Sequence, residues 1–232
     1  MTYEIFDINK KKKNNLHRII YFSHHSLSRF LKRRNINIFI DGTFKCVPKQ
    51  FYQCLILIVE DDETDLFIPV SFFLVDTKES WAIWHFLNMS LQLSNCTLKP
   101  KSIMTDYEKG LVKTIKEFFP KSQIFGCLFH WKQALRRKLL KLKINEKSVH
   151  IAMKSGCLDL LSIINKKDIP TAINYLKTII PINEESEKWN EFFIYFNKIW
   201  INEDYFEMWN NFKVTVYQMT RTPVINFFFI LI

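Results

Sequence analysis

Residues 36–41 read INIFID, and residues 102–106 read SIMTD. Each is a short apolar run rich in β-branched side chains, which is typical of a buried strand. Each also carries a carboxylate, Asp41 or Asp106, at or just past its end. A strand holds such a carboxylate on a stiff backbone with its head free at the sheet edge. Two such carboxylates, one on each strand, could bind a pair of divalent metal ions, an arrangement that cuts and joins phosphodiesters.

The elements around these two runs are predicted from hydrophobic periodicity. Short connections at 45–50, which contain Pro48, and at the acidic 60–63 predict that the first three strands form antiparallel hairpins. Asp106 is a plausible N-cap for the helix that follows it. The expected strands cover residues 36–44, 51–59, 66–75, 101–105 and 122–127, and the expected helices cover 78–94, 107–119 and 128–143.

The order β-β-β-α-β-α-β-α predicts an α/β fold with a mixed five-stranded sheet of ribonuclease-H-like type. In that layout the first and fourth strands are neighbours at the centre, so Asp41 and Asp106 would meet. Two like charges so close are unfavourable unless a cation, such as Mg²⁺, lies between them. The alternatives are structural: helix capping for Asp106, and a turn before Gly42 for Asp41. Glu108 is interpreted as a first-turn acid favoured by the helix dipole.

The remaining chain divides into segments of different character. Residues 1–35 are polar and basic, with a weak helix expected over 16–31. Residues 36–144 form the expected catalytic core, and 145–222 form an all-helical insertion rich in Ile, Leu, Phe and Trp. Residues 223–232 are an apolar tail, too short to span a bilayer and interpreted as the truncated end of the catalytic domain.

Composition favours a polyanionic partner. The 232 residues carry a formal net charge of +10, from 33 Lys and Arg against 23 Asp and Glu. Such a basic chain most often binds nucleic acid. A proteome biased toward Ile, Asn and Lys would also give this net charge. The five Cys are odd in number and irregularly spaced, and no secretory signal precedes them. We therefore expect a reducing compartment, the nucleus or the cytoplasm, and no secretion or membrane insertion.

Cys127 and His130 form a Cys-x-x-His pair just beyond the fifth expected strand. The spacing would suit half of a zinc site, but a second ligand pair is hard to find in the sequence. Alternatively, His130 reaches the aspartates and contacts the scissile phosphate or orients a nucleophile, while Cys127 is a core residue. The helix that follows is basic, and four of its residues are predicted to contact DNA: Lys132, Arg136, Arg137 and Lys138.

Four ordered motifs resemble those of Mutator-like (MULE) transposases. Residues 40–45 (IDGTFK), with Pro48 and 51–53 (FYQ), resemble the opening motif of that family. Residues 105–109 (TDYEK) are similar to its second-aspartate motif, and 126–131 (GCLFHW) to its Cys-x-x-His signature. Residues 192–200 resemble the aromatic stretch near the end of its helical insertion. The resemblance covers roughly residues 30 to 222.

The resemblance implies a DDE-type recombinase that cuts transposon ends and joins them to target DNA with Mg²⁺ or Mn²⁺. Asp41 and Asp106 would bind metal, and Cys127 with His130 would form the family's Cys-x-x-His element. DNA would be the partner, and a second copy of the chain or a full-length transposase is a further candidate. The family's third acid is a Glu, whereas the corresponding position here holds Phe227.

Because the third acid is missing, the resemblance predicts weak or absent strand transfer. The alternative is a catalytically inactive, transposase-derived protein that binds DNA without cutting it. A plain ribonuclease H or resolvase would share the sheet, but it would not explain the Cys-x-x-His pair or the helical insertion.

Overall fold

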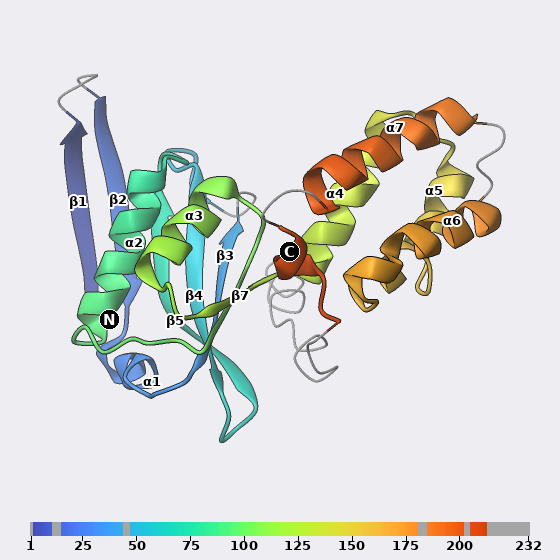
Figure 1. The fold of residues 1–232 in the computed structure, drawn as a ribbon. Helices are drawn as coiled ribbons and strands as arrows, with labels where there is room; N and C mark the ends of the chain where they lie inside the picture. The colour runs from blue at the N-terminus through green and yellow to red at the C-terminus, as the bar shows by residue number, and fades with distance from the viewer. Residues whose placement is uncertain (1, 11–14, 44–46, 181–184, 202–204, 213–232) are drawn as a thin grey trace. The chain divides into compact units, whose positions relative to one another are not determined.

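The computed structural model describes residues 2–10, 15–43, 47–180, 185–201 and 205–212 (Figure 1). These residues form two compact units that divide between Phe125 and Gly126. We call the first the sheet unit and the second the helical unit. The expected core at 36–144 and insertion at 145–222 remain predictions, since compactness divides the chain earlier.

The sheet unit is built on one mixed sheet of seven strands in the order β1-β2-β5-β4-β3-β6-β7. Within this sheet, β3 pairs antiparallel with β4 and parallel with β6. The α/β class predicted from the sequence is therefore confirmed. The strands are β1 (Thr2–Lys10), β2 (Asn15–Ser23), β3 (Asn37–Thr43), β4 (Gln53–Asp61), β5 (Leu66–Val75), β6 (Ser102–Thr105) and β7 (Gln123–Gly126).

The N-terminal segment differs from the prediction. Instead of a helix over 16–31, β1 and β2 form an antiparallel hairpin, and β2 pairs with β5. Helical structure is confined to a 3₁₀ turn (His25–Leu27) and the short α1 (Ser28–Leu31). Alternate side chains of β2 are buried, with Ile19 and Tyr21 in the core. The segment therefore follows the two-residue repeat of a strand, although its apolar residues also fit the spacing of a helix. The hairpin enlarges the sheet beyond the five strands expected.

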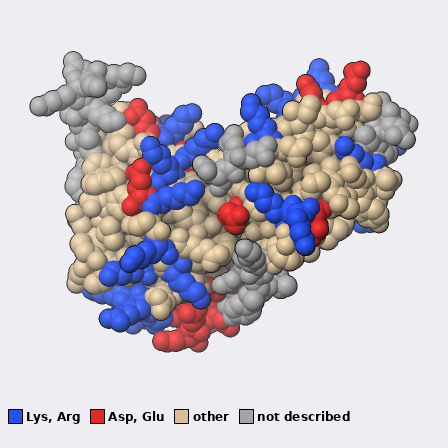
Figure 2. Space-filling view, in the orientation of Figure 1, with Lys and Arg blue, Asp and Glu red and all other residues tan. Residues whose placement is uncertain are grey.

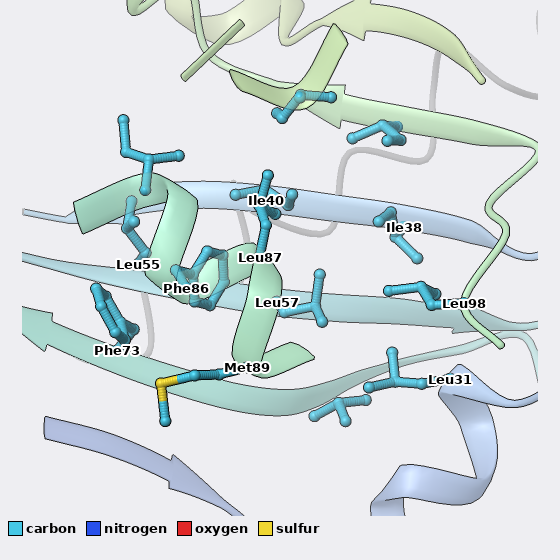
Figure 3. Packing of buried hydrophobic residues seen from close by; sticks show 14 of the residues in the cluster. Leu31, Ile38, Ile40, Leu55, Leu57, Phe73, Phe86, Leu87, Met89 and Leu98 are labelled. Atoms are coloured by element: carbon cyan, nitrogen blue, oxygen red, sulfur yellow. The ribbon is translucent and has the colours of Figure 1, made fainter. Parts of the chain in front are cut away.

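Helices α2 (Ser80–Leu93) and α3 (Lys109–Phe118) cover one face of the sheet (Figure 1). Their apolar residues meet side chains that point up from β3, β4 and β5. Phe86 of α2 lies against Phe73 of β5, with ring centroids 5.4 Å apart (Figure 3). Burying aromatic and aliphatic side chains of this size is the main source of stability for such a layer.

The opposite face carries a smaller apolar cluster formed by Phe39, Cys54, Ile56 and Ile58. The register between β4 and β5 shifts at Leu57 and Ile58, opposite Pro69. A proline cannot donate to the ladder, so an irregularity at this point is expected. Because side chains alternate along β3, Ile38 and Ile40 point to the helices and Phe39 to this second face.

The helical unit has an aromatic core. Trp131 stacks on Trp209 at 4.8 Å with an interplanar angle of 8°. The described part of residues 145–222 contains helical segments and turns, as the sequence predicted. Within the described ranges, no helix is both long enough and apolar enough to cross a bilayer. The helices are α4 (Leu128–Lys141), α5 (Glu146–Met153), α6 (Ile169–Ile179), α7 (Ser186–Phe196) and α8 (Phe206–Trp209), with 3₁₀ turns at Leu158–Ser162 and Lys166–Asp168 and a π-helical turn at Asn197–Ile201.

Candidate active site

Asp41 lies within β3, two residues before the strand ends. It stands opposite Ile56 of β4, so its side chain belongs to the sheet face that carries Phe39 and Ile56 rather than to the helix-covered face. The residue is only 4% exposed. A carboxylate at this place is therefore held rigidly and has lost most of its water.

Asp106 follows directly after β6. The parallel register pairs Ile40 with Thr105, so the next residues along the two strands are Asp41 and Asp106. The predicted adjacency of these two strands is confirmed. The charge of Asp106 acts on Asp41, as expected for neighbouring carboxylates. The role of the pair in binding metal stays a prediction.

The electrostatics of Asp41 follow from this position. Burial, and then the nearby charge of Asp106, together raise the pKa of Asp41 to about 7, while the backbone N–H of Gly42 opposes the shift by donating to the carboxylate. Near neutral pH the carboxylate is therefore poised between holding a proton and holding a negative charge. A bound cation would favour the charged form.

Asp106 is not the N-cap of α3 that we expected. Its Oδ1 accepts a hydrogen bond from the backbone N–H of Glu108 at 2.9 Å, and Glu108 takes the N-cap position. Burial, and then the charge of Asp106, raise the pKa of Glu108, and Lys78 opposes this shift. Glu108 thus lies within the field of Asp106. Its spacing two residues after Asp106 was the only sequence signal for this.

Behind the pair, the strands pack closely at Gly42. A Cβ at this position would lie 3.3 Å from Cδ2 of Leu55 and 3.6 Å from Oε1 of Gln53. Gln53 is fully buried. The absence of a side chain at Gly42 therefore lets β4 side chains fill the space directly beneath the carboxylate-bearing backbone of β3.

The chemistry of the pair fits a hard divalent cation. Carboxylate oxygens are the ligands that Mg²⁺ prefers, usually one or two per ion with waters completing the shell. Within the described ranges, no group of three or more His, Cys, Asp and Glu side chains is arranged to hold a metal ion. Phe227, where the family's third acid is expected, lies outside the described residues, as does the whole apolar tail.

Cys127 and His130 belong to the helical unit. Cys127 is buried and occupies the N-cap position of α4, and its carbonyl accepts the N–H of Trp131 at 3.0 Å. His130 is half-buried, with its ring 5.6 Å from that of Phe129. The burial of Cys127 agrees with a core residue. The proposed contact of His130 with phosphate or nucleophile stays a prediction.

The four basic residues predicted to contact DNA differ in their surroundings. Lys132 pairs with Asp159, with Nζ 3.5 Å from Oδ2. Lys138 lies over the ring of Tyr195 at 5.2 Å, and Arg136 and Arg137 are exposed to solvent. The two arginines are therefore the members of the set that are best placed to meet a ligand, although DNA binding by all four remains a prediction.

A comparison with protein families identifies part of the chain. The family model of the MULE transposase domain matches residues 37–134. The match begins at β3 and runs through both carboxylates and the Cys-x-x-His pair to the first half of α4. The match supports a MULE transposase domain at residues 37–134. A search of curated proteins found no match to the chain.

Proposed function

We propose that the chain is a MULE-type DDE transposase domain with a ribonuclease-H-like core, acting in DNA transposition and recombination. The observation that carries this proposal is the parallel pairing of β3 with β6, which brings a buried Asp41 next to Asp106 inside the matched segment. The five strands β5-β4-β3-β6-β7 follow the order expected of a ribonuclease-H-like sheet. The N-terminal hairpin is an addition at the β5 edge.

In this proposal Asp41 and Asp106 hold Mg²⁺ or Mn²⁺. The metal would activate the attacking oxygen and stabilise the leaving oxygen of a phosphodiester. The chain's own residues fix the positions of the two carboxylates and set their electrostatic environment. The β3–β6 ladder fixes both carboxylates, burial deprives Asp41 of water, and the Glu108 N–H holds one oxygen of Asp106.

Activity is expected to be weak, because Phe227 stands at the position of the family's third acid. A missing carboxylate ligand typically lowers the rate by orders of magnitude, each factor of ten being about 1.4 kcal/mol. The second candidate function is therefore a DNA-binding protein derived from a transposase and inactive in cleavage. The net charge of +10 favours DNA as its partner, a second copy or a full-length transposase is a further candidate, and the nucleus is the proposed location.

A nicking assay tests the first function. The full chain is incubated with supercoiled plasmid and Mn²⁺, and the wild type is compared with Asp41→Ala and with the control Asp62→Ala, an exposed acid at the β4–β5 turn. We expect slow nicking by the wild type and the control and none by Asp41→Ala. Nicking that survives Asp41→Ala would reject the assigned site.

A binding assay separates the two functions. If the wild type does not nick but binds DNA with an affinity that falls steeply with salt, the inactive DNA-binding protein is favoured. If it neither nicks nor binds, both functions are rejected. Metal binding is read separately, from a rise in melting temperature with Mn²⁺ that Asp106→Asn removes.

A further inference from the structure

We propose that the solvent face of α3, on the helix-covered side of the sheet and with Trp84 of α2 at its flank, is a DNA-binding surface. The inference rests on the proposed function, since it assigns a second contact surface to the same DNA. It concerns the sheet unit alone and uses none of the basic residues of α4.

Three lysines form one stripe on α3. Lys109, Lys113 and Lys116 are spaced i, i+4 and i+7, so at about 100° per residue they fall within an arc of about 60°. The opposite side of α3 is buried through Leu111 and Ile115. All three lysines are exposed, and Figure 2 shows blue side chains gathered over the region that α3 occupies in Figure 1.

Lys113 is held only weakly within its own helix. Lys113 is 78% exposed, and its ion pair with Glu117 spans 4.0 Å. An exposed i,i+4 pair of this length contributes little to stability and is screened by salt. Lys113 can therefore exchange this ion pair for a contact with a phosphate at little cost in free energy.

The position of α3 places the stripe near Asp106 along the chain, but on the other side of the sheet from Asp41. The helix begins at Lys109, three residues after Asp106. At this end α3 packs on α2, because a Cβ at Gly110 would lie 3.6 Å from Cδ1 of Ile83 and 3.9 Å from Cβ of Ser80. DNA bound along the stripe would therefore run along the outside of the helix layer, on the side of the sheet opposite to the face that carries Asp41.

The length of the stripe suits a nucleic-acid strand. From Lys109 to Lys116 the helix rises about 10 Å, and one strand of duplex DNA presents a phosphate about every 3.4 Å along its axis. The stripe can thus follow about three consecutive phosphates. A single small anion would need converging donors, whereas these three lysines lie in a row.

Trp84 adds a second, independent feature. Its side chain is 45% exposed, although tryptophan is one of the more buried residue types on average. It lies at the boundary between α2 and α3, with its ring 5.7 Å from Phe118 and 5.4 Å from His85. An indole that contacts neighbouring rings and is open to solvent is typical of a platform on which an unpaired base stacks.

The test compares DNA binding by the full chain and its variants, followed by fluorescence anisotropy of labelled duplexes at several salt concentrations. The stripe variant is Lys113→Glu with Lys116→Glu. The matched control is Lys32→Glu with Arg34→Glu, which makes the same charge change at exposed residues that precede β3, at the end of the strand opposite to Asp41. Melting temperatures confirm that each variant folds.

We expect the stripe variant to bind about tenfold or more weakly and its salt slope to fall by about two, one for each lysine removed from a phosphate. The control should stay close to the wild type. Trp84→Ala should weaken binding to a duplex with a single-stranded overhang while leaving a blunt duplex unaffected.

Three results would overturn the inference in different ways. If the stripe variant and the control bind equally well while substitution of Arg136 and Arg137 abolishes binding, the surface on α3 is rejected and the proposed function stands. If Trp84→Ala has no effect on the overhang, the stacking part is rejected. If the wild type binds no DNA at all, the DNA partner of the proposed function fails together with the inference.

Discussion

At the scale of single residues, Asp41 should control how stability depends on pH. Its pKa is raised to about 7, mainly by burial. A raised carboxyl pKa means that the folded state holds the proton more tightly than the unfolded state. The stability of the metal-free protein therefore falls as pH rises from the ordinary carboxyl range to about 7, and the full penalty is present above it. Asp41→Asn removes this ionisation.

We expect Asp41→Asn to raise the free energy of unfolding relative to wild type by about 2 kcal/mol more at pH 8 than at pH 5. The measurement is urea unfolding of the metal-free protein at both pH values. Asp62→Asn, at an exposed position, should show no such difference. An equal effect of Asp41→Asn at both pH values would mean that the buried carboxylate does not ionise in this range.

The residues of the candidate site were predictable to different degrees. Asp41 and Asp106 could be found because each terminates an apolar run, and strand order then brings the runs together. The capping arrangement could not, because the choice between Asp106 and Glu108 as N-cap depends on one hydrogen bond at the start of α3. The raised pKa of Asp41 depends on burial by other strands, which a local sequence pattern does not predict.

At the scale of elements, β3 to β7 and α2 to α4 were predictable because each has a clear period and a clear stop. The β1–β2 hairpin was not. In β2 the apolar residues at 16, 19 and 20 also fit a helix, and the decision comes from pairing with β5, which is distant along the chain. Tertiary pairing of this kind overrides local preference.

One side chain ties this hairpin to the core. Asp76, just after β5, has Oδ1 3.0 Å from Nδ1 of His17, and its Oδ2 accepts the backbone N–H of Arg18 at 3.0 Å. We expect Asp76→Ala to cost about 1 kcal/mol and to loosen β2 locally. Hydrogen exchange should then quicken for backbone amides in Asn15–Ser23 and stay unchanged in Gln53–Asp61. If Asp76→Ala leaves exchange unchanged in both strands, β2 is held by its backbone hydrogen bonds to the neighbouring strands alone.

At the scale of the whole molecule, the matched domain and the compact units do not coincide. The family match ends at residue 134, inside α4, whereas compactness divides the chain at Phe125. The sequence could show a change of period near this point, from strand–helix alternation to helices alone. It could not show which compact unit α4 belongs to, because the contact of Trp131 with Trp209 links residues far apart in sequence.

Two compact units predict two unfolding transitions that respond to different substitutions. Trp209 is fully buried, stacks on Trp131, and donates from Nε1 to the carbonyl of Trp200 at 2.8 Å. Trp209→Ala should cost the helical unit about 3–5 kcal/mol. Differential scanning calorimetry should show one transition lowered, while the other keeps its Mn²⁺-dependent shift. The control is Trp84→Ala, at an exposed ring of the sheet unit. It should leave the melting temperature of the helical unit at its wild-type value. A single transition that moves as a whole in Trp209→Ala would instead show that the sheet and the helices unfold as one cooperative body.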